Sequence, residues 1–147
     1  MMRVGEIVNL KWTSIDMTRK LIHVQNQFDY RLKTPYPHAV PMNAWVFTYL
    51  DAQDDREGHV FSRANGDPLT RNYVSRLFCR FSRKAGLDKG LHFHSLRHSG
   101  ASWLVQNGVP LYEVQKLLGH RSIITTQMYA HLAPSELHAT VDKIVVT

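Results

Sequence analysis

Glycines divide the second half of the chain into short helical segments, and this spacing limits the possible folds more than any other feature. Apolar residues recur at helical spacing in four segments. These run from Thr70 to Ala85, from about Ser95 to Asn107, from Leu111 to Leu118 and from Ile123 to about His131. A glycine follows each of the first three, at the place where helices commonly end in a left-handed residue. We therefore expect this half to fold as a set of short packed helices.

The first half is expected to form a short helix, a small sheet and a second helix. Val4, Ile7, Val8 and Leu10 fit an amphipathic helix. Three short β-rich runs follow, separated by turn-forming residues and prolines: LIHVQNQ, FDYRLKT and HAVPM. They predict a three-stranded antiparallel sheet. A helix capped by Asn43 and ending near Ala52 would bury an apolar stripe of Val46, Phe47 and Leu50.

With 147 residues and no long linker, the chain fits one α+β domain that is mainly helical. No stretch is apolar and long enough to cross a bilayer, and no signal peptide is visible at the start. One cysteine, Cys79, fits a reducing compartment and is expected to act as a small buried hydrophobe. Together these features predict a cytoplasmic protein.

The charge balance favours a polyanionic partner. The chain has 18 Lys and Arg against 12 Asp and Glu, a formal net charge of +6. Basic residues placed on phosphates release condensed counterions, which favours nucleic acid as that partner. Part of the excess lies on one face of the predicted 70–85 helix, as Arg71, Arg76, Arg80, Arg83 and Lys84. A solvated helix face is the simpler interpretation of this group, and phosphate contact is its rival.

Between His92 and His131 the sequence brings together side chains suited to phosphodiester chemistry: His94, Arg97, His120 and Tyr129. His94 and Arg97 stand three apart at the start of a helix, so they share one face. The backbone N–H groups of a helix N-terminus also favour a bound phosphate. Cations can hold the phosphate and stabilise its transition state, and a phenol can act as the nucleophile.

Two other classes of function fit parts of the same region. His92, His94 and His98 could be ligands of a metal-dependent hydrolase, although no carboxylate lies at ligand spacing on the same element. The segment GVPLYEVQKLLGHRSIITTQMYAH is also typical of a helix-turn-helix, which predicts a non-catalytic DNA-binding module.

The segment HSLRHSGASWLVQNGVPLYEVQKLLGHRSIITTQMYAHL resembles the C-terminal signature of the tyrosine recombinases, also called the phage integrase family. The start, MRVGEIVNLKW, is similar to the family's first arginine motif and places that arginine at Arg3. RLKTPYPHAVPM matches the lysine turn and the following strand, with Lys33 in the lysine position. The resemblance therefore covers nearly the whole chain, with the motifs in the family's order.

The resemblance implies the catalytic-domain fold of DNA breaking-rejoining enzymes and a role for each matched residue. Tyr129 would attack duplex DNA to form a 3′-phosphotyrosine, while Arg3 and Arg97 grip the phosphate. His120 would donate a hydrogen bond to it. Lys33 is the implied general acid and His94 the implied base or proton shuttle near the tyrosine. Neither a metal nor ATP is implied. The expected partners are double-stranded DNA and other recombinase protomers.

The resemblance also sorts the neighbouring residues. Arg121 joins the basic residues expected on DNA. Glu6, Leu96, Leu118 and Gly119 are interpreted as structural. His98 and His131 are interpreted as supporting or surface residues rather than catalytic ones.

Arg3 stands almost at the start of the chain, where the family has a leading helix and, before it, a DNA-clamping domain. We therefore expect a truncated catalytic domain over residues 1–147. The tail, residues 134–147, would pack on a neighbouring protomer or fold back on its own. The alternative is a non-catalytic helix-turn-helix remnant of a mobile element.

Overall fold

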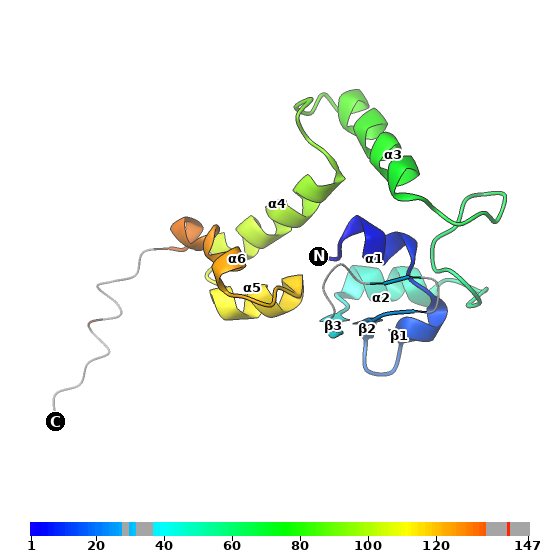
Figure 1. Cartoon of the computed structure of the whole chain (residues 1–147), viewed down its shortest axis with the longest axis horizontal. Helices are drawn as coiled ribbons and strands as arrows, with labels where there is room; N and C mark the ends of the chain where they lie inside the picture. The colour runs from blue at the N-terminus through cyan, green and yellow to red at the C-terminus, as the bar shows by residue number, and fades with distance from the viewer. Residues whose placement is uncertain (28–29, 32–36, 135–140, 142–147) are drawn as a thin grey trace.

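The computed structural model describes residues 1–27, 30–31, 37–134 and 141. In the first half of the chain its elements are α1 (Val4–Val8), a 3-10 turn η1 (Trp12–Ser14), the strands β1 (Ile15–Asp16), β2 (Leu21–Val24) and β3 (His38–Pro41), and α2 (Ala44–Asp51). In the second half they are α3 (Arg71–Lys84), α4 (Phe93–Gln106), α5 (Leu111–Leu118), α6 (Ile124–Gln127) and a 3-10 turn η2 (Ala130–Leu132). Figure 1 shows the sheet lying with α1 and α2, while α4, α5 and α6 form a separate helical group.

The three strands form an antiparallel sheet in the order β1-β2-β3, which confirms the predicted fold class. The strand assignment was partly wrong. The first strand is Ile15–Asp16, which is too short to leave a pattern in the sequence. Of the FDYRLKT run, the structure describes Tyr30 and Arg31, and Tyr30 forms an isolated bridge with Gln27.

Two apolar clusters hold the described part of the chain together. The first contains Leu10, which follows α1, and Ile22, Val24 and Val40 of the sheet. Residues 22 and 24 alternate with half-exposed neighbours, as expected of a strand with one buried face. The second joins α4, α5 and the turn before η2 through Ala101, Val105, Val114, Leu118 and Tyr129. Each cluster buries a different set of elements, so residues on their facing sides can form a site between them.

The helix ends of the second half follow local rules that the sequence shows. The Thr70 hydroxyl accepts a hydrogen bond from the Tyr73 N–H and so caps α3. Gly86, Gly108 and Gly119 all have positive φ, as their positions after the helices predicted. The Asn43 side chain caps α2 in the same way, through the Val46 N–H. Five helices are predicted between the sheet and the tail. Four of them form as predicted: α2, α3, α4 and α5.

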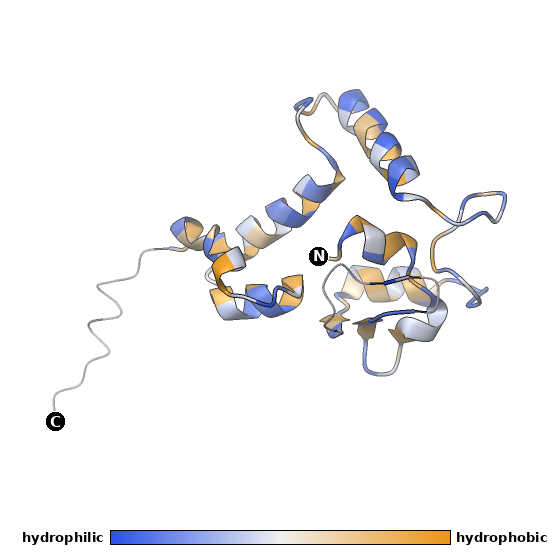
Figure 2. Cartoon of the chain, viewed as in Figure 1, coloured by the Kyte–Doolittle hydropathy of each residue, from blue (hydrophilic) through white to orange (hydrophobic). Residues whose placement is uncertain are grey.

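Several detailed predictions were wrong. The Ile123–His131 segment is two short pieces, α6 and η2, because the chain turns at Met128 and Tyr129 between them. Val46 is 39% exposed, and the α2 side chain that is buried is Leu50. Figure 2 colours much of α2 as apolar, and Trp45 and Tyr49 of this helix are exposed as well. Leu96 is 55% exposed, so its interpretation as structural finds no packing to support it. Cys79 is half-buried rather than buried.

No helix in the described ranges is both long enough and apolar enough to span a membrane. The tail prediction for residues 134–147 falls almost entirely outside the described residues.

Candidate active site

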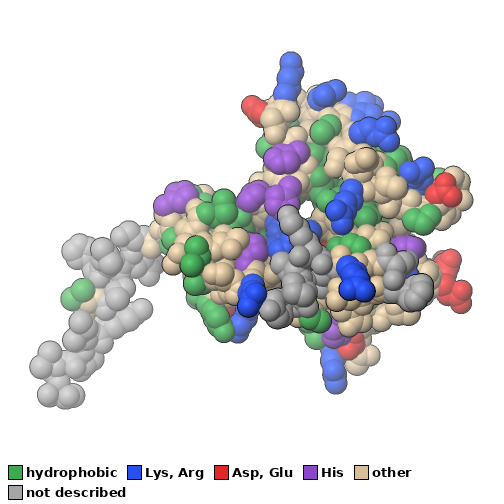
Figure 3. Space-filling view, in the orientation of Figure 1, with side chains coloured by type: hydrophobic (Ala, Val, Ile, Leu, Met, Phe, Trp, Pro, Cys, Tyr) green, Lys and Arg blue, Asp and Glu red, His purple; other side chains and the backbone are tan. Residues whose placement is uncertain are grey.

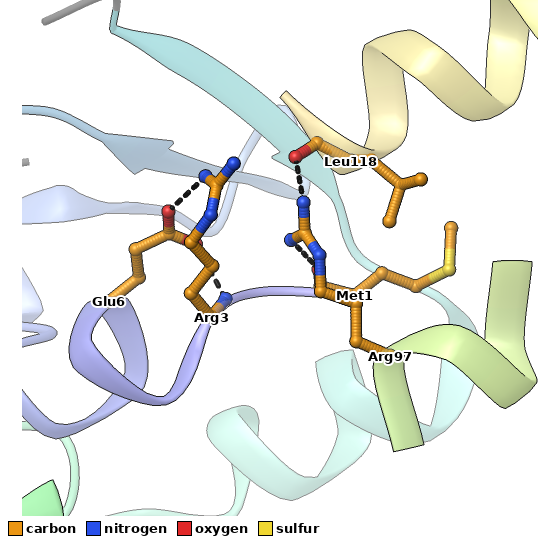
Figure 4. Close-up of polar contacts among 5 residues, drawn as sticks. All are labelled: Met1, Arg3, Glu6, Arg97 and Leu118. Atoms are coloured by element: carbon orange, nitrogen blue, oxygen red, sulfur yellow. Dashed lines mark hydrogen bonds and ion pairs between the residues drawn. The ribbon is translucent and has the colours of Figure 1, made fainter. Parts of the chain in front are cut away.

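Arg97 of α4 lies where the start of the chain meets the end of α5. It follows the first turn of α4 and is only 5% exposed. One terminal nitrogen of its guanidinium donates to the Met1 carbonyl and the other donates to the Leu118 carbonyl at the end of α5 (Figure 4). The partial negative charge of a helix C-terminus favours a cation in this place. A guanidinium carries five N–H donors, so a group held at both ends in this way keeps donors for a further partner.

Arg3 approaches Arg97 from α1 (Figure 4). Its guanidinium donates to Glu6 Oε1 at 2.8 Å, and its backbone N–H donates to Glu6 Oε2 at 2.7 Å. Glu6 is 4% exposed, so the carboxylate both caps α1 and fixes the arginine from a buried position. This confirms the interpretation of Glu6 as structural.

The two arginines act on each other. Burial, followed by the charge of Arg3, lowers the pKa of Arg97 to about 10, and Glu6 opposes the shift. Arg97 therefore stays charged at neutral pH. Two guanidinium groups held together with one carboxylate leave a net positive charge, which is what an anionic ligand requires.

Tyr129 lies in the turn between α6 and η2 and is only 4% exposed. Its ring belongs to the second apolar cluster, with Ala101 and Val105 of α4. Burial raises the pKa of its phenol, and the charge of Arg97 works in the opposite direction. A nucleophilic phenol in this position needs a nearby proton acceptor, because its route to bulk water is restricted.

Two histidines of α4 stand beside the tyrosine. His98 Nδ1 and Tyr129 Oη form a hydrogen bond of 2.6 Å. The ring of His94, one helical turn earlier, meets the ring of His98 edge-on, with centroids 4.8 Å apart. Burial, followed by the charges of His98 and Arg97, lowers the pKa of His94. The ring that contacts the phenol is thus His98, and the expected catalytic His94 contacts that ring.

His120 follows the left-handed Gly119 that ends α5. Its Nδ1 shares a hydrogen bond of 3.0 Å with the hydroxyl of Thr126, a residue with no exposed surface. Burial, followed by the charges of Arg97 and Arg3, lowers the pKa of His120 to about 4. The ring is therefore neutral at pH 7. When the Thr126 hydroxyl donates to Nδ1, the ring proton lies on Nε2, which is then a donor for a ligand.

The structure brings together five of the six residues that the sequence indicated as catalytic: Arg3, His94, Arg97, His120 and Tyr129. Arg3 lies beside Arg97, which is bonded to the end of α5 just before His120, and His94 adjoins the His98 ring that is bonded to Tyr129. The space-filling view shows histidines grouped beside Lys and Arg over α4 and its neighbours (Figure 3). The sixth residue, Lys33, lies outside the described residues.

The basic residues expected on DNA have different surroundings. Arg76, Arg80, Arg83 and Lys84 are exposed along α3 and border one shallow surface depression. Arg71 is directed elsewhere, because its guanidinium lies over Gly5 of α1. Arg121 is exposed next to His120.

His92 and His98, two of the three possible metal ligands in the sequence, have other contacts. His92 Nδ1 lies 3.0 Å from the Ser95 hydroxyl, and His98 is bonded to Tyr129. Among the residues that the structure describes, no group of three or more His, Cys, Asp or Glu is placed to hold a metal ion.

Two contacts of the site were missed by reasoning from the sequence. His98 was left outside the catalytic set, although its spacing of four from His94 places both on one face of a helix. Thr126 had no signal, because its pairing with His120 depends on how α6 turns back toward α5.

Known proteins match this chain along most of its length. The model of the phage integrase family matches residues 1–136. The tyrosine recombinase XerD of Lacticaseibacillus casei is 34% identical over 97% of this chain and 50% of its own length. A crystal structure of XerA recombinase superposes with a TM-score of 0.72 at 28% identity, over 99% of this chain and 53% of that protein.

A third match is the XerH site-specific recombinase, solved bound to a palindromic difH substrate in a post-cleavage complex. It has a TM-score of 0.67 at 25% identity, over 97% of this chain and 42% of that protein. The chain spans about half the length of the curated relatives it matches.

Proposed function

Because the chain belongs to the phage integrase family, we propose that it cleaves and rejoins duplex DNA at specific sites through a covalent phosphotyrosine. The observation that carries the proposal is the grouping of Arg3 beside Arg97, with Arg97 bonded to the end of α5 just before His120, and with Tyr129 packed against α4 and α5. Such a grouping suits a phosphate whose charge grows in the transition state.

Each residue has a part that follows from its surroundings. Tyr129 attacks the phosphorus, while Arg3 and Arg97 bind the non-bridging oxygens. Arg97 is already held by two carbonyls, and Arg3 by Glu6, so neither needs to be ordered when DNA binds. Neutral His120 donates from Nε2. We assign the protonation of the leaving 5′-oxygen to Lys33, in line with the family motif, and a supporting role near the phosphate to His94.

The energy of the broken phosphodiester bond is kept in the phosphotyrosine, so a 5′-hydroxyl can reverse the step without ATP. The positive charge of two guanidinium groups, with a hydrogen bond from neutral His120, supplies the stabilisation that many phosphoryl-transfer sites take from Mg²⁺. The proposed partners are double-stranded DNA and further protomers on the same DNA, with the 134–147 tail as a candidate contact between them. We expect the protein to act in the cytoplasm.

The test is covalent trapping on a nicked duplex that loses its 5′-hydroxyl fragment after cleavage. We expect a protein–DNA adduct from the wild-type chain and none from Tyr129→Phe. Tyr49→Phe is the matched control, since this tyrosine of α2 is 54% exposed and is expected to leave the adduct unchanged. DNA binding without any adduct from the wild type would instead support the helix-turn-helix binding module.

The exposed arginines of α3 are proposed to contact the DNA backbone. Substitution of Arg76, Arg80 and Arg83 together by Gln should weaken binding at all sequences alike. It should also reduce the slope of log affinity against log salt by about 3, close to one per lost phosphate contact. Arg56→Gln is the control, because this exposed arginine instead pairs with Asp51 at 3.1 Å. An unchanged slope in the triple variant would leave α3 as a solvated surface.

A further inference from the structure

We propose that His98 is the proton acceptor for the nucleophile Tyr129, an assignment that rests on the proposed DNA cleavage. The contact that supports it is the 2.6 Å hydrogen bond between His98 Nδ1 and Tyr129 Oη. The two rings are tilted by 47° with centroids 6.0 Å apart, so the bond joins the ring edge to the hydroxyl and is not a stacking contact. A general base must lie within hydrogen-bond distance of the proton that it removes, and His98 does.

Packing keeps this pair in place. His98 and Ala101 lie on the same side of α4, and Ala101 has no exposed surface against the tyrosine's cluster. Tyr129 is 4% exposed, so its proton has little direct access to solvent. An acceptor already bonded to the phenol removes the need for that access.

Arg97 makes the same pair productive. It precedes His98 in α4, and its charge opposes the rise that burial causes in the pKa of the Tyr129 phenol. In the proposed step the phosphate is held by Arg97 on one side of the phenol oxygen, and His98 is bonded to that oxygen on the other. One turn of α4 would thus supply both the phosphate grip and the acceptor.

The proposed step balances as follows. The proton on Tyr129 Oη moves to His98 Nδ1 as the Oη–P bond forms. The P–O5′ bond breaks, and the departing 5′-oxygen takes a proton from the general acid assigned to Lys33. In rejoining, the P–O5′ bond forms as the 5′-hydroxyl gives its proton back to the group assigned to Lys33, and His98 returns its proton to Oη as the Oη–P bond breaks. The neutral ring must start with its proton on Nε2, since Nδ1 has to accept.

His94 has a different place. Its ring lies against His98 with an interplanar angle of 87°, and it is more exposed than His98. His94 therefore adjoins the ring of the acceptor His98, which is the ring bonded to the phenol oxygen.

The first test needs no activity. Nitrogen-15 NMR of the imidazoles in the DNA-free chain at pH 7.5 reports where each ring proton lies, and loss of one signal in His98→Asn assigns His98. We expect Nδ1 to be unprotonated and Nε2 to carry the proton. A proton on Nδ1, in the other tautomer or in the charged ring, would overturn the proposal.

The second test uses single-turnover adduct formation on the nicked duplex. Asn keeps an acceptor near the position of Nδ1 but cannot take a proton, so it separates proton transfer from simple positioning. We expect His98→Asn to form the adduct about 10²-fold more slowly, the lower range for a lost general base. His131→Asn is the matched control, since this residue of η2 is exposed, and it should stay within about twofold. A loss below about tenfold in His98→Asn would refute the assignment.

A substrate with sulfur at the bridging 5′ position shows which side of the phosphate His98 serves. A thiolate leaves without a proton, so this substrate should restore Lys33→Ala and leave His98→Asn slow. Restoration of His98→Asn would place it on the leaving-group side and overturn the proposal. Absence of an adduct from the wild type would count against the proposed function instead, while the tautomer measurement still decides whether His98 accepts from Tyr129.

Discussion

Replacing Glu6 with Ala tests whether the first arginine is held by its carboxylate. Glu6 makes two charge-assisted hydrogen bonds, one to the Arg3 guanidinium at 2.8 Å and one to its backbone N–H at 2.7 Å. The substitution leaves that N–H without its acceptor at the start of α1. It also removes the anion that opposes the mutual repulsion of Arg3 and Arg97.

The expected loss follows from these contacts. A hydrogen bond to a charged group contributes roughly 1.5–3 kcal/mol. The Arg3 side chain is 21% exposed, so water can replace part of its bond, whereas the Glu6 side chain is 2% exposed. The two bonds are discounted for that exposure. A further discount of about 1.5 kcal/mol applies because alanine has no side-chain entropy to lose on folding, which leaves a loss of about 2 kcal/mol. Glu6→Gln keeps one acceptor oxygen and should lose about 1 kcal/mol.

Urea unfolding followed by circular dichroism measures the difference at constant slope. The control is Asp51→Ala, which removes an ion pair with Arg56 whose side chains are 58% and 41% exposed. Pairs of this kind contribute little, so the control should change the unfolding free energy by less than about 0.5 kcal/mol. If Glu6→Ala is as mild as Asp51→Ala, then Arg3 is held by something other than this carboxylate.

Three further outcomes are expected. Gly119→Ala should cost at least about 2 kcal/mol in urea unfolding, because it keeps a φ of +60° and brings Cβ to 2.6 Å from the His38 ring. Gly66→Ala, with positive φ and nothing within 4 Å, should cost about 1 kcal/mol, and equal losses would contradict the close approach. Leu118→Ala removes a fully buried side chain and should lower the unfolding free energy by about 3 kcal/mol. Leu87→Ala is the control, since Leu87 is 51% exposed, and should cost less than about 0.5 kcal/mol. Similar losses in the two variants would refute the packing of Leu118. The pKa of His120 is lowered from 6.5 to about 4, so the unfolded chain binds more protons in that window. Stability should therefore fall by about 1 kcal/mol, after discounting for solvent screening, as pH drops from 6.5 to 4; His120→Asn should flatten this part of the curve.

Local rules account for most of the fold that could be predicted. Caps such as Thr70 and the glycines after α3, α4 and α5 fix helix ends through contacts within a few residues. The failures occur where distant contacts decide. β1 has two residues and exists because it pairs with β2. The predicted last helix divides because Tyr129 turns into a cluster built by α4 and α5.

In the candidate site, too, local sequence signals could be predicted and contacts between distant residues could not. Arg97 stands near a helix start and His120 after a glycine turn, and the order of the family motifs identified both of them together with Tyr129. The motifs could not show that His98, rather than His94, meets the phenol. Both histidines lie on one face of α4, and the choice between them depends on where the chain places Tyr129, 31 residues later.

Arg97 shows how the arrangement of the site depends on the fold as a whole. Its two hydrogen bonds join the Met1 carbonyl, just before α1, to the Leu118 carbonyl at the end of α5. Met1 also packs on the second apolar cluster, and Met2 packs on the first. The guanidinium thus ties together the two parts of the chain that carry Arg3 and Tyr129. Burial lowers the pKa of this guanidinium and makes a missing acceptor costly. The two hydrogen bonds therefore fix these parts of the chain relative to each other. Arg97→Lys should therefore loosen the placement of Arg3 as well as the grip on phosphate, since an ammonium cannot bridge both carbonyls with a planar fork.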